Sequence, residues 1–364
     1  GGVAGRAGGY GAPRGPDPRP RAARGRRGRA AVTWGDPAGI GPELVQALLD
    51  DGGLAREVQL GVLGPADLKP EGLGTWEGPD SGDSGAHLWC ATPGSGRVTM
   101  GSAQADCGRT ALAALRRGAD MAQAGEVEAL VTAPVCKQAL HLAGEEVEGQ
   151  TELLGRWAEA SQCEMVAMAG NLRVMLLSRH LSLAAALKEV RRPAIVERLL
   201  LFDSTLRAEG IADPRLAVAG LNPHAGEGGL FGSEEIDEIA PAVADARAQG
   251  LSVEGPISPD RVFLEGSRGQ WDGVLALYHD QGFIPLKLLS QGRGVTLLAG
   301  LPYRRLSPVH GTAFDIAGSG RADPANLRVA VQMAARGAIG APPAQEEGPP
   351  NPLEGVDCDS LSPT

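Results

Sequence analysis

The stretch GVLALYH (residues 273–279) is a run of apolar residues that ends in Tyr and His. Comparable apolar runs recur along the chain at residues 30–34, 58–64, 129–134, 166–170, 174–178, 216–222 and 295–300. Because the apolar residues are continuous rather than alternating, these runs are typical of strands in a sheet that is covered on both faces. Helix-like stretches lie between them, at residues 42–50, 110–125, 151–162, 182–210 and 233–250. The alternation predicts an α/β fold in which a mostly parallel sheet lies between layers of helices.

The composition narrows the class of protein. Of the 364 residues, 43% are hydrophobic but only 4% are aromatic, so the core is expected to consist of Ala, Val, Leu and Ile. No apolar run approaches the roughly 20 residues that span a bilayer, and no charged-then-apolar leader opens the sequence. These features disfavour a membrane or exported protein and predict a cytoplasmic one. The five cysteines are scattered without a CxxC spacing, which disfavours a disulfide framework or a structural zinc site.

Both ends of the chain differ in composition from residues 32–340, where the catalytic region is expected. Residues 1–31 are rich in Arg, Gly and Pro and have little to bury, so this arm is predicted to be disordered. Residues 341–364 form a Pro-rich acidic tail, and the same prediction applies to them. The net charge of −10 divides into +7 on the first 30 residues and −17 on the other 334. An Arg-rich arm can bind nucleic acid, but the acidic body disfavours nucleic acid as a partner.

Three of the six histidines stand at the same place relative to an expected strand. His180 and His224 follow the runs at 174–178 and 216–222, and His279 ends the run at 273–279. Ligands collect at the carboxyl ends of strands in such a sheet, so these imidazoles are expected on one edge. A lone histidine is more often structural, but three with an open coordination position describe a catalytic divalent-metal site. The sequence therefore favours a metal site at these three residues.

The segment YHDQGFIPLK (278–287) places further reactive groups beside one of these histidines. Asp280 is a carboxylate, and Lys287 is one of only four lysines in the chain. A carboxylate and an amine beside a metal ligand suggest acid–base chemistry on a metal-bound oxygen. The alternative is a solvated loop without a role.

Two other segments have groups suited to anions. A helix is expected to begin in GQTELLG (149–155), where Thr151 is a plausible cap. The N-terminus of that helix could equally bind a phosphate. Arg304 and Arg305 could each bind a phosphate or carboxylate through two hydrogen bonds.

Seven segments, in order along the chain, resemble motifs of one family. They are GDPAGIGPE (35–43), VTAPVCK (131–137), GQTELL (149–154), LNPHAGEGG (221–229), GPISPDRVF (255–263), YHDQGFIPLK (278–287) and GLPYRRLSPVHGTAFDIAGSG (300–320). Together they are similar to the 4-hydroxythreonine-4-phosphate dehydrogenase (PdxA) family over residues 32–327. The resemblance implies two α/β/α subdomains flanking an active-site cleft, as in isocitrate and isopropylmalate dehydrogenases. It also implies a homodimer whose active site is shared between the subunits.

The resemblance implies a reaction as well. The secondary alcohol of a small phosphorylated substrate would be oxidised by NAD, with NADP as the alternative, and the resulting β-keto acid would lose CO2. The expected substrate is 4-phosphohydroxy-L-threonine, which would become 3-amino-2-oxopropyl phosphate in pyridoxal 5′-phosphate (vitamin B6) biosynthesis. One divalent metal ion per site, zinc, magnesium or cobalt, is implied.

Residue roles follow from the same resemblance. The implied metal ligands are His180, His224 and His279, the three histidines already singled out at strand ends. The implied substrate-binding residues are Gln150, Thr151, Lys287, Thr296 and Arg305. The catalytic candidates are Asp260, Asp280 and Lys287, of which Asp280 is expected to orient the metal site. The loop HGTAFDIAG would bind the nucleotide cofactor through His310, Gly311, Thr312 and Asp315.

Three positions depart from the family pattern. Gln150 stands where the family usually has His, Thr296 where it usually has Asn, and Val309 where it usually has Asp. The first two are substrate contacts, so the substrate is left open, whereas all three metal histidines are kept. A dehydrogenase of 4-phosphothreonate or 4-phosphoerythronate, or more remotely of a cis-dihydrodiol, is the alternative. A degenerate paralogue that binds a metabolite without turnover is a further one.

Overall fold

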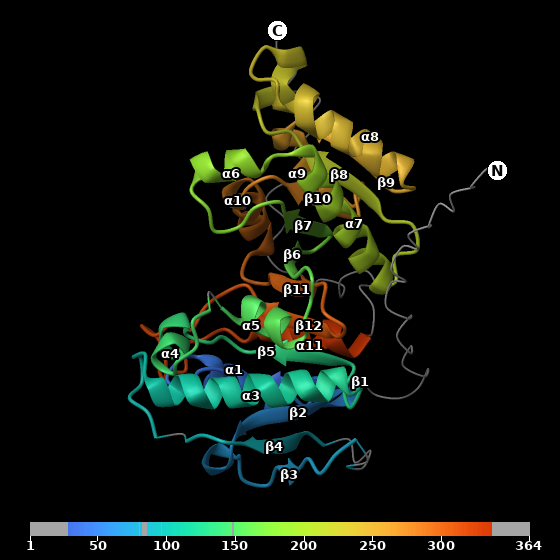
Figure 1. Cartoon of the computed structure of the whole chain (residues 1–364). Coiled ribbons are helices and arrows are strands. Elements are labelled where there is room, and N and C mark those ends of the chain that lie inside the picture. The colour runs from blue at the N-terminus through green and yellow to red at the C-terminus, as the bar shows by residue number, and fades with distance from the viewer. Residues whose placement is uncertain (1–27, 80, 82–85, 96, 148, 337–364) are drawn as a thin grey trace, which may run out of the picture.

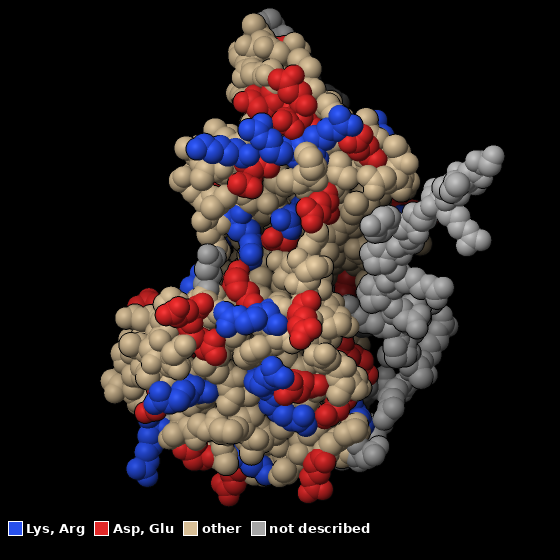
Figure 2. All heavy atoms as spheres, in the orientation of Figure 1, with Lys and Arg blue, Asp and Glu red and all other residues tan. Residues whose placement is uncertain are grey.

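The computed structural model describes residues 28–79, 81, 86–95, 97–147 and 149–336, and it shows two lobes joined by a narrower waist (Figures 1 and 2). The twelve strands of these residues form one sheet that runs through both lobes, in the order β3-β4-β2-β1-β5-β12-β11-β6-β7-β10-β8-β9. Helices cover the sheet in both lobes. No helix of the described residues is both long and apolar enough to cross a membrane.

The lower lobe in Figure 1 contains a block of parallel strands. The strands are β1 (Gly28–Thr33), β2 (Val58–Pro65), β3 (Gly74–Thr75), β4 (Leu88–Thr92), β5 (Ala129–Thr132) and β12 (Arg304–Pro308). The helices are α1 (Gly41–Leu49), α2 (Leu54–Glu57), η1 (Ala66–Leu68), α3 (Ala105–Gln123), α4 (Lys137–Leu142), α5 (Gln150–Trp157) and α11 (Ala325–Arg336). Ala30 and Val32 of β1 pack with residues of α1 and α11, whereas Ala31 packs with residues of α3. Both faces of the block are therefore buried, as the continuous apolar runs predict.

The upper lobe contains a second parallel block. Its strands are β7 (Leu172–Leu176), β8 (Arg215–Ala219), β9 (Ser252–Ile257) and β10 (Gly273–Ala276). Its helices are α6 (Leu183–Glu189), α7 (Arg192–Ala208), η2 (Pro223–Gly229), η3 (Glu235–Ile239), α8 (Ala240–Ala248), α9 (Pro259–Ser267) and α10 (His279–Ser290). The expected helix at 182–210 is divided into α6 and α7 because Pro193 begins a new helix in its first turn, where a proline is tolerated.

Two strands at the waist reverse the direction of the sheet. β11 (Val295–Ala299) is antiparallel to both β12 and β6 (Glu164–Ala169), and β6 is antiparallel to β7. Three of the eleven strand pairs are therefore antiparallel, and the two parallel blocks run in opposite directions. The α/β fold with two subdomains is confirmed.

The predicted boundary of the N-terminal arm is wrong by four residues. Residues 28–31 belong to β1, where Ala30 and Ala31 have no exposed surface. Gly28 fits there because α11 passes so close that a Cβ would lie 2.6 Å from the Ala335 carbonyl oxygen. The rest of the arm and the C-terminal tail at 341–364 lie outside the described residues.

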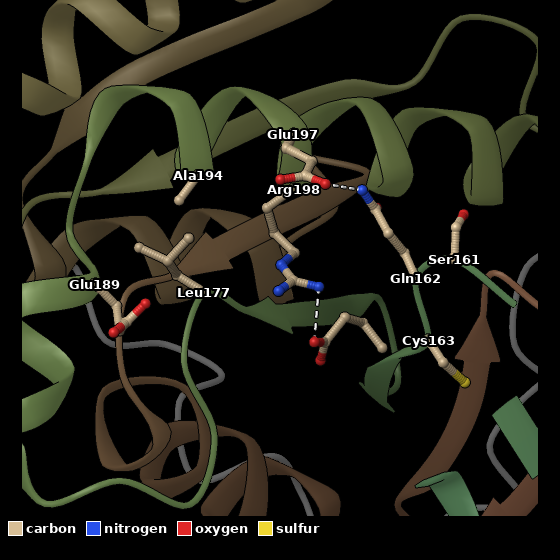
Figure 3. A pocket seen from close by; sticks show the side chains of 9 residues that line it. Ser161, Gln162, Cys163, Leu177, Glu189, Ala194, Glu197 and Arg198 are labelled. Carbon is tan, nitrogen blue, oxygen red and sulfur yellow. Dashed lines mark hydrogen bonds and ion pairs between the residues drawn. The ribbon is translucent and has the colours of Figure 1, made fainter. Parts of the chain in front are cut away.

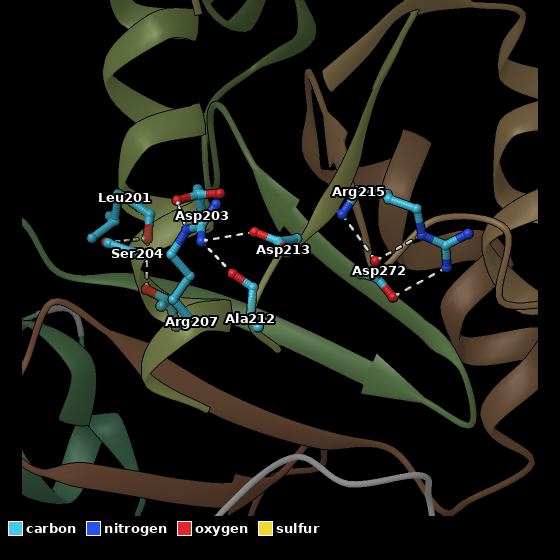
Figure 4. A network of polar contacts seen from close by, with 9 residues as sticks. Leu201, Asp203, Ser204, Arg207, Ala212, Asp213, Arg215 and Asp272 are labelled. Atoms are coloured by element: carbon cyan, nitrogen blue, oxygen red, sulfur yellow. Dashed lines mark hydrogen bonds and ion pairs between the residues drawn. The ribbon is translucent and has the colours of Figure 1, made fainter. Parts of the chain in front are cut away.

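Ion pairs secure the amino-terminal edge of the upper block (Figure 4). The Arg215 guanidinium lies 3.0 Å from Asp272, and the two residues also exchange backbone contacts, which fixes the start of β8 against the start of β10. Arg207, near the end of α7, pairs with Asp203 at 2.7 Å and donates to the Ala212 carbonyl. These charges are structural, and they lie at the edge of the strands opposite to the carboxyl ends.

A buried ion pair connects the lobes. Arg304 of β12 and Glu209 at the end of α7 are only 4% and 3% exposed, and the guanidinium donates to both carboxylate oxygens at 2.5–3.0 Å. Arg304 also donates to the Met333 and Ala334 carbonyls of α11. The pair satisfies two charges that burial would otherwise make costly.

Replacing Arg304 with Ala is expected to lower the free energy of unfolding by about 3–5 kcal/mol, because Glu209 would remain buried without a counter-charge. Arg109→Ala, which removes an exposed pair with Asp106, is the control and is expected to cost about 1 kcal/mol or less. Urea unfolding measures both. The double variant Arg304→Met/Glu209→Met should regain most of the free energy of unfolding that Arg304→Ala loses. If Arg304→Ala and Arg109→Ala cost the same, the argument is contradicted.

Candidate active site

The three strand-end histidines follow neighbouring parallel strands. His180 follows β7, His279 follows β10 and His224 follows β8, and β10 pairs in parallel with both of the other strands. The carboxyl ends of parallel neighbours meet at one edge of a sheet, so all three loops leave the sheet at the same edge. The prediction that these histidines share an edge is confirmed.

Side chains connect the three loops to one another. The Ser178 hydroxyl, after β7, donates to the Leu277 carbonyl after β10 at 3.0 Å. Gln281 accepts from the Leu277 amide at 2.7 Å and donates to the Gly220 carbonyl, after β8, at 2.7 Å. These contacts fix the loops against each other. The sequence places Gln281 beside His279 and Asp280 but assigns it no role, because its Gly220 partner is 61 residues away.

Two of the histidines lie close together. The ring centroids of His180 and His279 are 5.8 Å apart, and the His279 ring stacks on Phe283 at 4.7 Å. His279 Nδ1 lies 2.7 Å from a carboxylate oxygen of Asp280, so the proton on Nδ1 is donated to Asp280. In the neutral imidazole this arrangement leaves the lone pair on Nε2, which is how a carboxylate orients a metal-binding imidazole.

His224 lies on an exposed turn, apart from the other two. Residues 224–229 all have positive φ, and His224 itself has φ 52°. Among the residues that the structure describes, no three His, Cys, Asp or Glu side chains are close enough to hold a metal ion. The donor set of two adjacent imidazoles suits a divalent cation. The metal site at all three histidines therefore stays a prediction.

Arg305 forms the centre of a second set of polar groups. It is 4% exposed and donates to the Thr132 hydroxyl at 2.6 Å and to the Gln150 side-chain oxygen at 3.0 Å. No carboxylate in the described part of the chain forms an ion pair with it. Burial away from water lowers the pKa of the Arg305 guanidinium to about 10. Glu152 is a carboxylate that acts on Arg305 only at longer range, without an ion pair. A buried cation with no carboxylate in direct contact is suited to binding an anion.

The start of α5 lies beside Arg305. The helix begins at Gln150, and no side chain caps it, so the predicted capping role of Thr151 is wrong. Gly149 occupies the capping position instead, and Thr151 lies inside the first turn of the helix, where it is buried. Lys137 Cε lies 3.6 Å from the position that a Cβ of Gly149 would occupy. A helix N-terminus, a lysine and a buried arginine are thus close together.

One ion pair brings the two sets of groups together. The Arg179 guanidinium, next to His180, lies 3.1 Å from Glu152 of α5 and 3.2 Å from Glu164 of β6. Residue 180 of the upper lobe therefore lies near residues 150–152 of the lower lobe. The histidine edge and the anion site are two sides of one candidate site.

The other expected site residues have different surroundings. Lys287 is exposed near the end of α10, eight residues after His279. Asp260 is exposed and accepts from the Ser258 hydroxyl at 2.6 Å. Thr296 is buried in β11, opposite Ser307 of β12. The roles expected of these three side chains stay predictions.

The loop expected to bind the nucleotide is anchored by α1. The Glu43 carboxylate accepts from the Gly318 and Gly320 amides at 3.1 and 2.9 Å, and the Ile40 amide donates to the Thr312 carbonyl at 3.0 Å. His310, Gly311, Thr312 and Asp315 lie at the start of this loop. The sequence places Glu43 in the first turn of a helix, where an acid suits the helix dipole. Its contacts with this loop could not be foreseen, because Gly318 and Gly320 are 275 residues or more away.

A cavity of about 380 Å³ lies between β6, α6 and α7 (Figure 3). Its charged lining includes Arg198, which pairs with Glu164 at 2.8 Å, and Glu197, which accepts from Gln162. None of the expected site residues lines the cavity. It adjoins the candidate site through Glu164, which pairs with Arg179.

Comparison with known proteins gives consistent results. The family model described as "Pyridoxal phosphate biosynthetic protein PdxA" matches residues 75–334. The D-threonate 4-phosphate dehydrogenase of Salmonella typhimurium is 41% identical over 318 residues, which cover 84% of this chain and 97% of the relative. The 4-hydroxythreonine-4-phosphate dehydrogenase of Beijerinckia indica is 39% identical over 317 residues, which cover 84% and 94%.

Solved structures resemble this chain as well. A 4-hydroxythreonine-4-phosphate dehydrogenase from Klebsiella pneumoniae superposes with a TM-score of 0.76 at 40% identity, covering 84% of this chain and 98% of that one. A terephthalate 1,2-cis-dihydrodiol dehydrogenase from Burkholderia xenovorans gives 0.61 at 28% identity, covering 87% and 100%. With a family model over residues 75–334 and relatives about 40% identical over nearly their whole length, this chain belongs to the PdxA family.

Proposed function

We propose that the protein is a metal- and NAD-dependent dehydrogenase that oxidises and decarboxylates a phosphorylated hydroxy acid, with 4-phosphohydroxy-L-threonine as the first candidate. The observation that carries the proposal is the contact between Arg179 and Glu152, because it brings the histidine edge close to the buried Arg305. A substrate with an anionic end and a reacting hydroxyl needs both groups within the length of a small molecule.

Arg305 would bind the anionic end of the substrate. Its guanidinium is held by Thr132 and Gln150, so it is oriented before the substrate arrives. A phosphate or carboxylate would supply the direct ion pair that the buried cation lacks, through charge-assisted hydrogen bonds. Lys137 and the start of α5 lie beside it and would favour the same charge.

The histidine edge would hold the reacting end. A divalent metal ion bound there would lower the pKa of the substrate hydroxyl, and NAD would accept the hydride. Asp280 keeps the proton on Nδ1 of His279 and so directs Nε2 outward. Glu43 holds the loop at 310–320 that would meet the cofactor. The proton of the hydroxyl leaves to solvent or to an acidic side chain, and the β-keto acid then loses CO2.

A second copy of the chain would complete the site. Every histidine loop is flanked by exposed apolar side chains, among them Leu183 after His180, Phe231 after His224 and Leu288 after His279. Leu288 is 71% exposed and Leu230 is 73% exposed. Exposed large apolar side chains on the segments that carry site residues favour a protein interface there. In the proposed homodimer, His180 and His279 of one copy would bind the metal with His224 of the other.

The shared site predicts complementation between inactive variants. His180→Ala and His224→Ala are each expected to abolish NADH formation with zinc, magnesium or cobalt present, without a lower melting temperature. When the two variants are co-expressed, half of the dimers are hybrids with one intact site, so about a quarter of the wild-type activity should return. A mixture as inactive as its components would contradict a site shared in this way.

Removing the buried charge predicts a loss of binding without a loss of stability. Arg305→Met is expected to raise the substrate KM by about 10–100-fold, because charge-assisted hydrogen bonds are lost. The melting temperature should stay the same or rise, because an unpaired buried charge disappears. Steady-state kinetics and thermal unfolding measure the two effects. An unchanged KM would show that the anion binds elsewhere, and Arg109→Met is the control for loss of an exposed arginine.

D-threonate 4-phosphate is the second candidate substrate, because a relative 41% identical to the chain carries that name. Gln150 touches Arg305 and lies where the family usually has His, so Gln150→His tests the choice. If 4-phosphohydroxy-L-threonine is the substrate, Gln150→His should change kcat/KM for it by less than tenfold. A tenfold change corresponds to about 1.4 kcal/mol of transition-state binding. A larger increase would favour D-threonate 4-phosphate. Absence of NADH with either substrate and any metal would instead favour a binding paralogue.

A further inference from the structure

We propose that Glu235 is a positioning residue that holds the turn carrying His224 in its left-handed conformation. The consequence for metal binding rests on the proposed function, whereas the conformational role does not. Glu235 lies at the start of η3, eleven residues after His224, and it is 3% exposed. Its side chain points back under the turn rather than into solvent.

The turn needs such support. Residues 224–229 have φ values between 42° and 99°, and three of them, His224, Ala225 and Glu227, are not glycine. For residues with a Cβ the left-handed region is strained, and consecutive strained residues persist only when their surroundings fix them. The turn therefore stores strain directly at a predicted metal ligand.

The Glu235 carboxylate supplies that support. One oxygen accepts from the Leu221 and Asn222 amides, each at 2.7 Å, and the other accepts from the Asn222 side-chain amide at 2.8 Å. These donors lie at the exit of β8, immediately before the turn. The turn also fits closely over the carboxylate, because a Cβ on Gly226 would lie 2.8 Å from its second oxygen. Glu235 thus fixes the direction in which the chain enters the turn.

The first test measures the conformation in metal-free protein. Amide hydrogen exchange, followed by mass spectrometry, compares wild type with Glu235→Gln, whose amide group cannot accept all three hydrogen bonds. Peptides that contain Leu221 and Asn222 are expected to exchange at least tenfold faster, with the rest of the chain unchanged. Glu238→Gln is the matched control, because Glu238 accepts from the Arg192 amide and contacts no residue of the turn. Equal exchange in wild type and Glu235→Gln would overturn the proposal.

The second test measures binding of Co2+ alone, by its absorption spectrum. Glu235→Gln is expected to weaken Co2+ binding by about 10–100-fold, the usual effect of losing a residue that orients a ligand. Adding Ala225→Gly, which relaxes the strained backbone, should restore part of that affinity. If wild type binds no Co2+, the metal proposal fails, while hydrogen exchange still decides the role of Glu235. If Glu235→Gln does not fold, Glu235→Asp, which is too short to reach both amides, replaces it in both tests.

Discussion

The parallel pairing of β10 with both β7 and β8 is the constraint on which the candidate site depends. Because three neighbouring strands end at one edge, three loops leave the sheet together, and each presents a histidine. Hydrogen bonds from Ser178 and Gln281 then fix these loops against one another. The strand alignment brings the groups to one edge, and buried polar side chains set their final positions.

The second constraint on the site is the reversal of strand direction at β6 and β11. It joins two parallel blocks that run in opposite directions into one sheet, and side chains of both lobes contact one another beside it. Arg179 then reaches Glu152 across the lobes, and Arg304 reaches Glu209 in the interior. The first pair lies beside the site and the second lies in the core. The same waist therefore supports both the stability of the fold and the assembly of the site.

Strands were predicted from the sequence where every residue of a run is apolar and buried. Runs that are apolar throughout, such as 129–134 and 273–279, are strands because both of their faces are covered. β12 was missed because Arg304 and Arg305 interrupt its apolar pattern, although both side chains are buried. Their charges are tolerated only through contacts with distant residues, Glu209 and Thr132. No local pattern could signal those contacts.

The sequence by itself determined the fold class, the family and the place of His180, His224 and His279 at strand ends, because apolar runs mark the strands and seven motifs mark the family. Only the tertiary structure decided that His180 and His279 meet while His224 lies apart on a left-handed turn. It also decided that Arg305 is buried and that, among the described residues, no carboxylate forms an ion pair with it. The reason is physical: backbone strain and desolvation depend on which distant groups pack around a residue, and that packing exists only in the folded chain.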